Sequence, residues 1–252
     1  MEYFVEGGSI VRKIWGKGDT ILFIFAGASA EFALNKAVDW LYFTGKLPAD
    51  PLKRLFSTIT YARQIVFSDQ ANALKAIDKI TAIHSTVEKN RGATIPDWAY
   101  RDVLFMLIHY SIASYEVMES KLTPAEKEDV YEVFYRLGKR MQLKDLPLNY
   151  QQWLLMREDH LKNDLIKSNY TIDLYRQYKK HLGIIRYKIL LEAQVLVVPP
   201  IVINLLNLGK ISLLTPVLGI YKFTRKLGLD WFFKSLILPK DYRAQVKELD
   251  VV

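Results

Sequence analysis

Residues 20–43 read TILFIFAGASAEFALNKAVDWLYF, and this stretch decides the fold. Its apolar residues recur at helical spacing, and its first half is apolar almost all round, which predicts a helix at the centre of a bundle. The small residues at positions 26–30 would let either a neighbouring helix or a flat ligand approach closely. Helical spacing continues along most of the chain and strand-like alternation is scarce, so we predict an all-α protein.

The composition excludes several kinds of chemistry. The 252 residues include no cysteine, which rules out disulfides, iron–sulfur clusters, zinc–thiolate sites and thiol catalysis. The formal net charge is +8, but Lys and Arg are scattered and accompany no zinc finger or dense basic helix. We therefore expect no nucleic-acid partner. The opening MEYFVEGGS lacks a basic start followed by an apolar run, so we expect no signal peptide and a cytoplasmic location.

Capping signals divide the chain into helices. Asp50 precedes Pro51, a pattern typical of a helix start, and Thr123, Pro124 and Glu126 form a capping box in the expected order. Other helices are predicted at about 20–43, 97–120, 150–168 and 171–188. No Gly/Ser-rich linker, low-complexity tract or repeat interrupts this part, so we interpret residues 1–188 as one domain.

Residues 189–252 form an apolar and basic C-terminal tail. Prolines and charges break its apolar run, ILLEAQVLVVPPIVINLLNLGKISLLTPVLGIY, into pieces shorter than the roughly 20 residues that a membrane span needs. We predict short helices that pack on the domain or lie peripherally at a membrane interface; a transmembrane hairpin bent at the prolines is the alternative. The basic residues expected at lipid headgroups are Lys188, Lys210, Lys222, Arg225 and Lys226.

Only four histidines are available for metal chemistry. His160 and His181 stand in polar contexts, REDHLKN and YKKHLG, and we expect both at the surface. His84, in AIDKITAIHSTVEK, and His109, in DVLFMLIHYSIASY, fall among apolar residues and are expected to be buried. A buried imidazole needs partners for its ring nitrogens. A satisfied core histidine or a metal or haem ligand would each meet that need.

A second candidate feature lies in DPLKRLFSTITYA. Arg54 and Thr58 are one helical turn apart and share a helix face. If buried, they would place a cation and a hydroxyl beside a pocket; if not, Arg54 is solvated and Thr58 bonds its own helix backbone. Motifs for zinc proteases, nucleotide binding and the nucleophile elbow are absent.

Four motifs in order resemble a known family. They are DPLKRLFSTITYARQIVF, IDKITAIHSTVEKNRG, LFMLIHYSIASYEVM and LTPAEKEDVYEVFYRLGKRMQLKDLPLNYQQW, within about residues 19–185. Together they resemble the MpaB-type oxygenases and the catalytic domain of latex-clearing protein, a rubber oxygenase. The resemblance implies a globin-related helical fold that encloses one haem b, and oxygenase activity on a hydrophobic, isoprenoid or lipid-like substrate with molecular oxygen.

The resemblance also implies roles for individual residues. His84 matches the family's axial haem ligand and would hold the iron. Arg54 and Thr58 match a catalytic pair near the other face of the haem, and His109 matches a further histidine that contacts the haem or lines its pocket. The rubber-cleaving members use a glutamate on an earlier helix as a base. Glu31 and Asp39 lie near the corresponding part of this chain, and the resemblance does not select either of them as its counterpart. The alternatives are a helical lipid- or membrane-binding protein and a non-catalytic haem sensor or carrier.

Overall fold

A computed structural model describes residues 2–45, 49–227 and 250, without the side chains of Leu52, Arg54, Leu55, Phe56 and Lys226. The protein is all-helical, as predicted: the described residues contain isolated β-bridges but no strand. The helices are α1 (Ile10–Trp15), α2 (Gly18–Leu34), η1 (Lys36–Val38), α3 (Asp39–Phe43), α5 (Pro51–Phe67), α6 (Gln70–Arg91), α7 (Asp97–Met118), α8 (Pro124–Arg140), α9 (Tyr150–Asn163), α10 (Asn169–Val197), α11 (Pro200–Leu206) and α12 (Leu214–Lys226).

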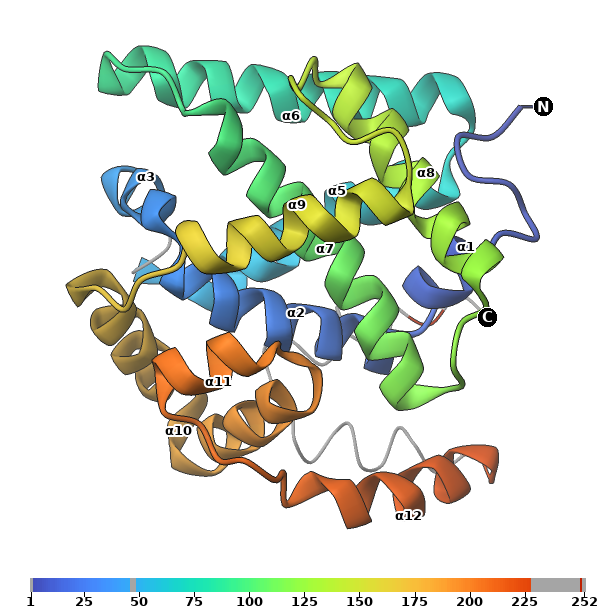
Figure 1. The fold of residues 1–252 in the computed structure, drawn as a ribbon, viewed down its shortest axis with the longest axis vertical. Helices are drawn as coiled ribbons and strands as arrows, with labels where there is room; N and C mark the ends of the chain where they lie inside the picture. Colours follow the sequence, from blue (N-terminus) through green and yellow to red (C-terminus); the bar gives the residue numbers. More distant parts are fainter. Residues whose placement is uncertain (1, 46–48, 228–249, 251–252) are drawn as a thin grey trace.

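Helix α2 occupies the centre of the bundle and packs mainly against α7 and α10 (Figure 1). Its small residues serve close helix packing. A Cβ added at Gly27 would lie 2.2 Å from Cδ1 of Tyr110, a fully buried residue of α7. Only glycine therefore fits where the Tyr110 ring lies against α2.

Local capping fixes several helix starts at the predicted residues. The Asp50 side chain accepts a hydrogen bond from the Lys53 backbone N–H at 2.9 Å, and Pro51 begins α5. Thr123 and Glu126 form the reciprocal capping box of α8. These devices act within three or four residues, which is why the sequence alone predicts them.

The predicted single helix over 20–43 is wrong. Helix α2 ends at Leu34, and η1 and α3 follow it. Asn35 has an extended backbone (ψ 134°), and its side chain accepts a hydrogen bond from Ala37 N–H at 2.8 Å. The break is held from outside by a backbone hydrogen bond from Lys36 N–H to the Asp164 carbonyl at 2.9 Å.

The C-terminal part leaves the core gradually. Helix α10 continues to Val197, with a non-helical Gly183 (φ 73°), and Val197, Val198 and Val202 belong to the main hydrophobic core. Helix α11 packs on α2, whereas α12 lies along the lower edge of the molecule (Figure 1). Within the described residues of the predicted tail, 189–197 complete the long helix α10, and the shorter helices α11 and α12 follow. Residues 228–249, 251 and 252 of the tail lie outside the described residues. Within the described residues, no helix combines the length and apolar character that crossing a membrane requires.

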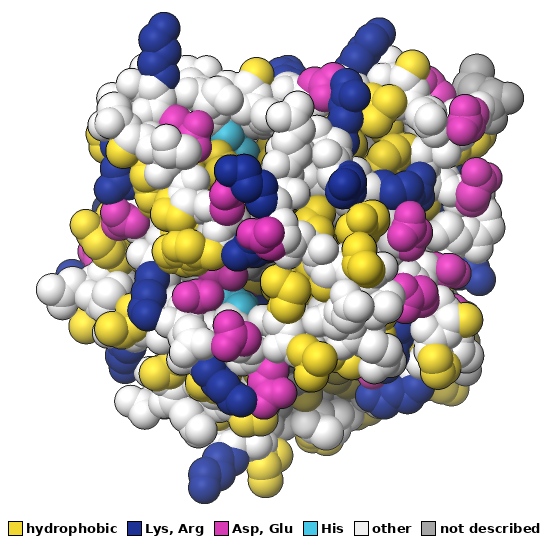
Figure 2. Space-filling view, turned by 45° about the horizontal axis from the view of Figure 1, so that its top comes forward, with side chains coloured by type: hydrophobic (Ala, Val, Ile, Leu, Met, Phe, Trp, Pro, Cys, Tyr) yellow, Lys and Arg dark blue, Asp and Glu magenta, His cyan; other side chains and the backbone are white. Residues whose placement is uncertain are grey.

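The outer surface carries charges of both signs. Figure 2 shows basic and acidic side chains interspersed on one face, with apolar side chains between them. No large field of a single sign appears on this face, which is the distribution of an ordinary solvated surface.

Candidate functional site

The structure places His84 near the start of α7. The His84 side chain is half-buried rather than fully buried, and its ring centroid lies 5.2 Å from that of Tyr100. The buried residues of α6 are Ala73, Ala76 and Ile77, and all three lie in the first half of the helix. The second half, which carries His84, therefore contributes little to the core. His84 is thus at a partly open position, where a bound group could reach it.

Arg54 and Thr58 lie on α5, which packs against α6. Thr58 is half-buried, and the side chain of Arg54 lies outside the described part of the structure. Arg54 and His84 are each about 14 or 15 residues from the turn that joins the two helices, or roughly 21–23 Å at 1.5 Å per residue. The two residues therefore lie at similar distances along their helices from this turn.

His109 has a different environment on α7. Its Nε2 is buried without a hydrogen-bond partner among the described residues, whereas the ring bonds the backbone of Val197. Burial, reinforced by the nearby Arg157 guanidinium, lowers the pKa of His109 to about 4. The imidazole is consequently neutral at pH 7, the form that binds metals or accepts a hydrogen bond.

Sequence reasoning missed a buried charged cluster built on α2, α7 and α9. Arg157 makes a bidentate ion pair with Glu31, and Tyr110 donates a hydrogen bond to Glu31 at 2.8 Å. His160 Nε2 lies 3.0 Å from the same carboxylate. Glu31 is 0% exposed, and Arg157 and His160 are each 3% exposed. The prediction that His160 lies at the surface is therefore wrong.

The helical spacing of α9 offered the missing signal. Trp153, Arg157 and His160 are the buried residues of this helix, and they follow one another at intervals of four and three. Because the residues of REDHLKN are polar, the sequence suggests a solvent-exposed face. The buried partner of Arg157 is Glu31, which is 126 positions away and cannot be identified from the local sequence.

The cluster keeps its members charged. Burial alone would raise the pKa of Glu31, but Arg157 and His160 outweigh burial and hold that pKa well below its usual range. Burial would lower the pKa of His160, but Asp102 and Glu31 raise it to about 9. Glu31 is therefore a poor general base, because its carboxylate is fully committed to these partners.

Asp39, the other acidic residue considered for that role, is also paired. Its Oδ2 lies 2.6 Å from Arg91 Nη2, and the Arg91 guanidinium stacks on the Trp40 ring at 3.9 Å. Asp39 thus pairs with Arg91 at a partly exposed position, whereas Glu31 is enclosed in the buried cluster.

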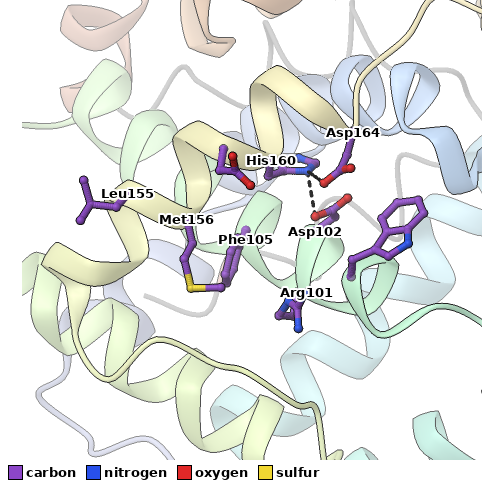
Figure 3. Close-up of a pocket in the computed structure, with 9 residues that line it drawn as sticks. Arg101, Asp102, Phe105, Leu155, Met156, His160 and Asp164 are labelled. Atoms are coloured by element: carbon purple, nitrogen blue, oxygen red, sulfur yellow. Dashed lines mark ion pairs between the residues drawn. The ribbon is translucent and has the colours of Figure 1, made fainter.

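A surface pocket opens beside the charged cluster (Figure 3). Its volume is about 300 Å³, and its walls combine apolar side chains of α7 and α9 with charged ones. Three of the lining residues, Asp102, His160 and Asp164, bring ligand-type atoms within 4.8 Å of one another. Figure 3 shows the two carboxylates pointing toward the His160 ring. This arrangement can bind a cation.

Comparison with known proteins identifies the family of the chain. The family model described as ER-bound oxygenase mpaB/B'/Rubber oxygenase, catalytic domain, matches residues 13–231, and the chain belongs to that family. The match includes every helix from α2 to α12. No curated protein and no solved structure gave a significant match.

Proposed function

We propose that the protein is a haem-b-dependent oxygenase that uses molecular oxygen on a hydrophobic, isoprenoid or lipid-like substrate. The observation that carries the proposal is the family match over residues 13–231, which makes the chain an oxygenase catalytic domain and contains all three of Arg54, Thr58 and His84. A globin-like enclosure of the haem within residues 1–188, with 189–252 as a tail, belongs to this proposal.

The donor groups of the chain suit a haem. His84 is half-buried on α6, and Arg54 lies on the adjacent helix α5 at a similar number of residues from the joining turn. His109 adds a neutral imidazole whose buried Nε2 lacks a hydrogen-bond partner in the described structure, so a bound group would satisfy it. We assign His84 as the axial ligand and His109 to the wall of the pocket.

A bound haem b would supply the iron centre for oxygen chemistry. Around it, the guanidinium of Arg54 would hold an anionic group such as a propionate, and the Thr58 hydroxyl would donate a hydrogen bond within the same pocket. Apolar side chains around the bound group would exclude water and accept a hydrocarbon chain. Glu31 takes no part in proton transfer here, because Arg157 holds its charge.

The exposed tail supports a hydrophobic substrate delivered from a lipid surface. Apolar side chains of α12 and of the segment just before it are exposed to solvent. Their exposed fractions range from 49 to 81%, and they are Ile211, Leu213, Val217, Ile220 and Phe223. Lys188 and Lys210 are exposed and could contact headgroups. Arg225 instead turns inward, to Asp19 at 2.9 Å and Glu119 at 2.7 Å. We propose peripheral membrane contact from the cytoplasm.

The same exposed tail favours one other function, that of a membrane-binding protein without haem. Oxygen uptake by the haem-supplemented full chain, measured with unsaturated isoprenoids dissolved in liposomes, separates the possibilities. An oxygenase consumes oxygen in proportion to the substrate cleaved, and the rate falls in Thr58→Val. A colourless protein that binds liposomes would support the membrane-binding function, and a haem protein that consumes no oxygen would be a sensor or carrier.

A further inference from the structure

The strongest unassigned feature is the place where α7, the end of α9 and the end of α2 meet. His160 Nδ1 lies 2.8 Å from Asp102 Oδ1 and 3.4 Å from Asp164 Oδ2. We propose that Asp102, His160 and Asp164 form a binding site for a divalent first-row metal ion such as Zn²⁺ or Mn²⁺, separate from the haem.

The distances match those of ligands around one ion. With metal–ligand bonds of about 2.1 Å, neighbouring ligand atoms are about 3.0 Å apart in octahedral and about 3.4 Å apart in tetrahedral coordination. The two contacts of Nδ1 span these values, and all three ligand atoms lie within 4.8 Å of one another. Small side-chain rotations would bring them around a common centre.

The missing hydrogen bond of His160 Nδ1 is a second, independent observation that points to a metal ligand. His160 is 3% exposed, and its Nδ1 makes no hydrogen bond of acceptable geometry although two carboxylates surround it. At a distance of 2.8 Å, the Asp102 oxygen must lie well off the axis on which Nδ1 would donate a proton. A buried nitrogen that faces two carboxylates without an aligned hydrogen bond is what a metal ligand presents.

Groups behind the ligands hold them in place. His160 Nε2 faces the Glu31 carboxylate at 3.0 Å, an arrangement that directs the Nδ1 lone pair toward the proposed ion. Asn35 donates a hydrogen bond to Asp102 Oδ2 at 2.8 Å. The Lys36 N–H bonds the Asp164 carbonyl, so the break after α2 fixes the third ligand. The helix break at Asn35 thus holds both Asp102 and Asp164 in position.

The charges of the cluster can accommodate a cation. Arg157 pairs with Glu31, and the Asp102 and Asp164 carboxylates face His160. A divalent ion that displaces the His160 proton would neutralise the two carboxylates of Asp102 and Asp164. Oxygen donors with one imidazole suit Mn²⁺, Zn²⁺ and Fe²⁺ better than soft ions.

The site is accessible from one side. Asp164 has a side-chain exposure of 26% and lies on the wall of the 300 Å³ pocket. Three protein ligands leave coordination positions for water on that side. Because the ligands come from α7 and from both sides of the end of α9, a bound ion would join these two helices.

Calorimetric titration of the full, chelator-treated chain with Zn²⁺, repeated with Mn²⁺, tests the proposal. We expect one ion per chain, a Tm higher by about 5 °C at a hundredfold excess over Kd, and at least about tenfold weaker binding in Asp164→Asn. Asp159→Asn is the matched control, because Asp159 lines the same pocket without belonging to the ligand set. Circular dichroism without metal checks that each variant folds.

Three results would overturn the site. They are the absence of Zn²⁺ and Mn²⁺ binding by the folded chain, unchanged affinity in Asp164→Asn, and equal weakening in Asp159→Asn. His84→Ala should bind Zn²⁺ like the unmodified chain, so the metal site can fail or succeed independently of the haem assignment.

Discussion

Replacing Arg157 by Met tests how the centre of the bundle is held together. The substitution leaves the 0% exposed Glu31 carboxylate without its bidentate partner, and breaking a buried pair in this way costs about 3–5 kcal/mol. We expect the lower end, about 3 kcal/mol, because Tyr110 and His160 still face Glu31. For a chain of this length the loss lowers Tm by roughly 6 °C.

The companion variants make the measurement decisive. Glu31→Gln combined with Arg157→Met removes both charges, and thermal unfolding followed by circular dichroism should show most of the lost stability restored. Arg140→Met is the surface control: Arg140 pairs with Asp78 at 2.7 Å, but both side chains are about half exposed, so no measurable change in Tm is expected. A Tm within 1 °C of the unmodified chain in Arg157→Met, or a double variant as unstable as the single one, would refute the reasoning.

Three further outcomes can be measured by thermal or urea unfolding. Gly27→Ala should cost about 1–3 kcal/mol because the added Cβ meets the Tyr110 ring, whereas Gly219→Ala, with open space around it, should cost nothing. The pKa of Glu31 is lowered on folding, so its contribution is complete above pH 4.5 and is lost as the pH falls below that value. The pKa of His160 rises from 6.5 to about 9 on folding, so the metal-free chain should lose on the order of 3 kcal/mol as the pH rises through this interval. A flat alkaline profile would contradict the charged state of His160.

Features of the fold that depend on nearby residues could be predicted from the sequence. The caps at Asp50 and Thr123 are set by contacts three residues apart, and the structure confirms both. The central position of α2 follows from its apolar surface, which needs no knowledge of its neighbours.

Features that depend on distant residues could not be predicted in this way. The helix break at Asn35 is held by Asp102 and by the chain around Asp164, both remote in sequence. His160 looks like a surface residue until Glu31 and Asp102 are placed beside it. The buried face of a helix is recognised in a sequence by the spacing of its hydrophobic residues. A buried face made of polar residues therefore escapes this recognition.

Haem binding by matched histidine variants tests the central claim most directly. Titration of the purified full chain with haem, followed at the Soret band, should give one equivalent per chain in the unmodified protein and in His109→Ala. His84→Ala should lose the ligand-dependent band while its circular dichroism remains helical. Full haem occupancy and an unchanged Soret band in a folded His84→Ala would contradict the assignment of His84 as the axial ligand.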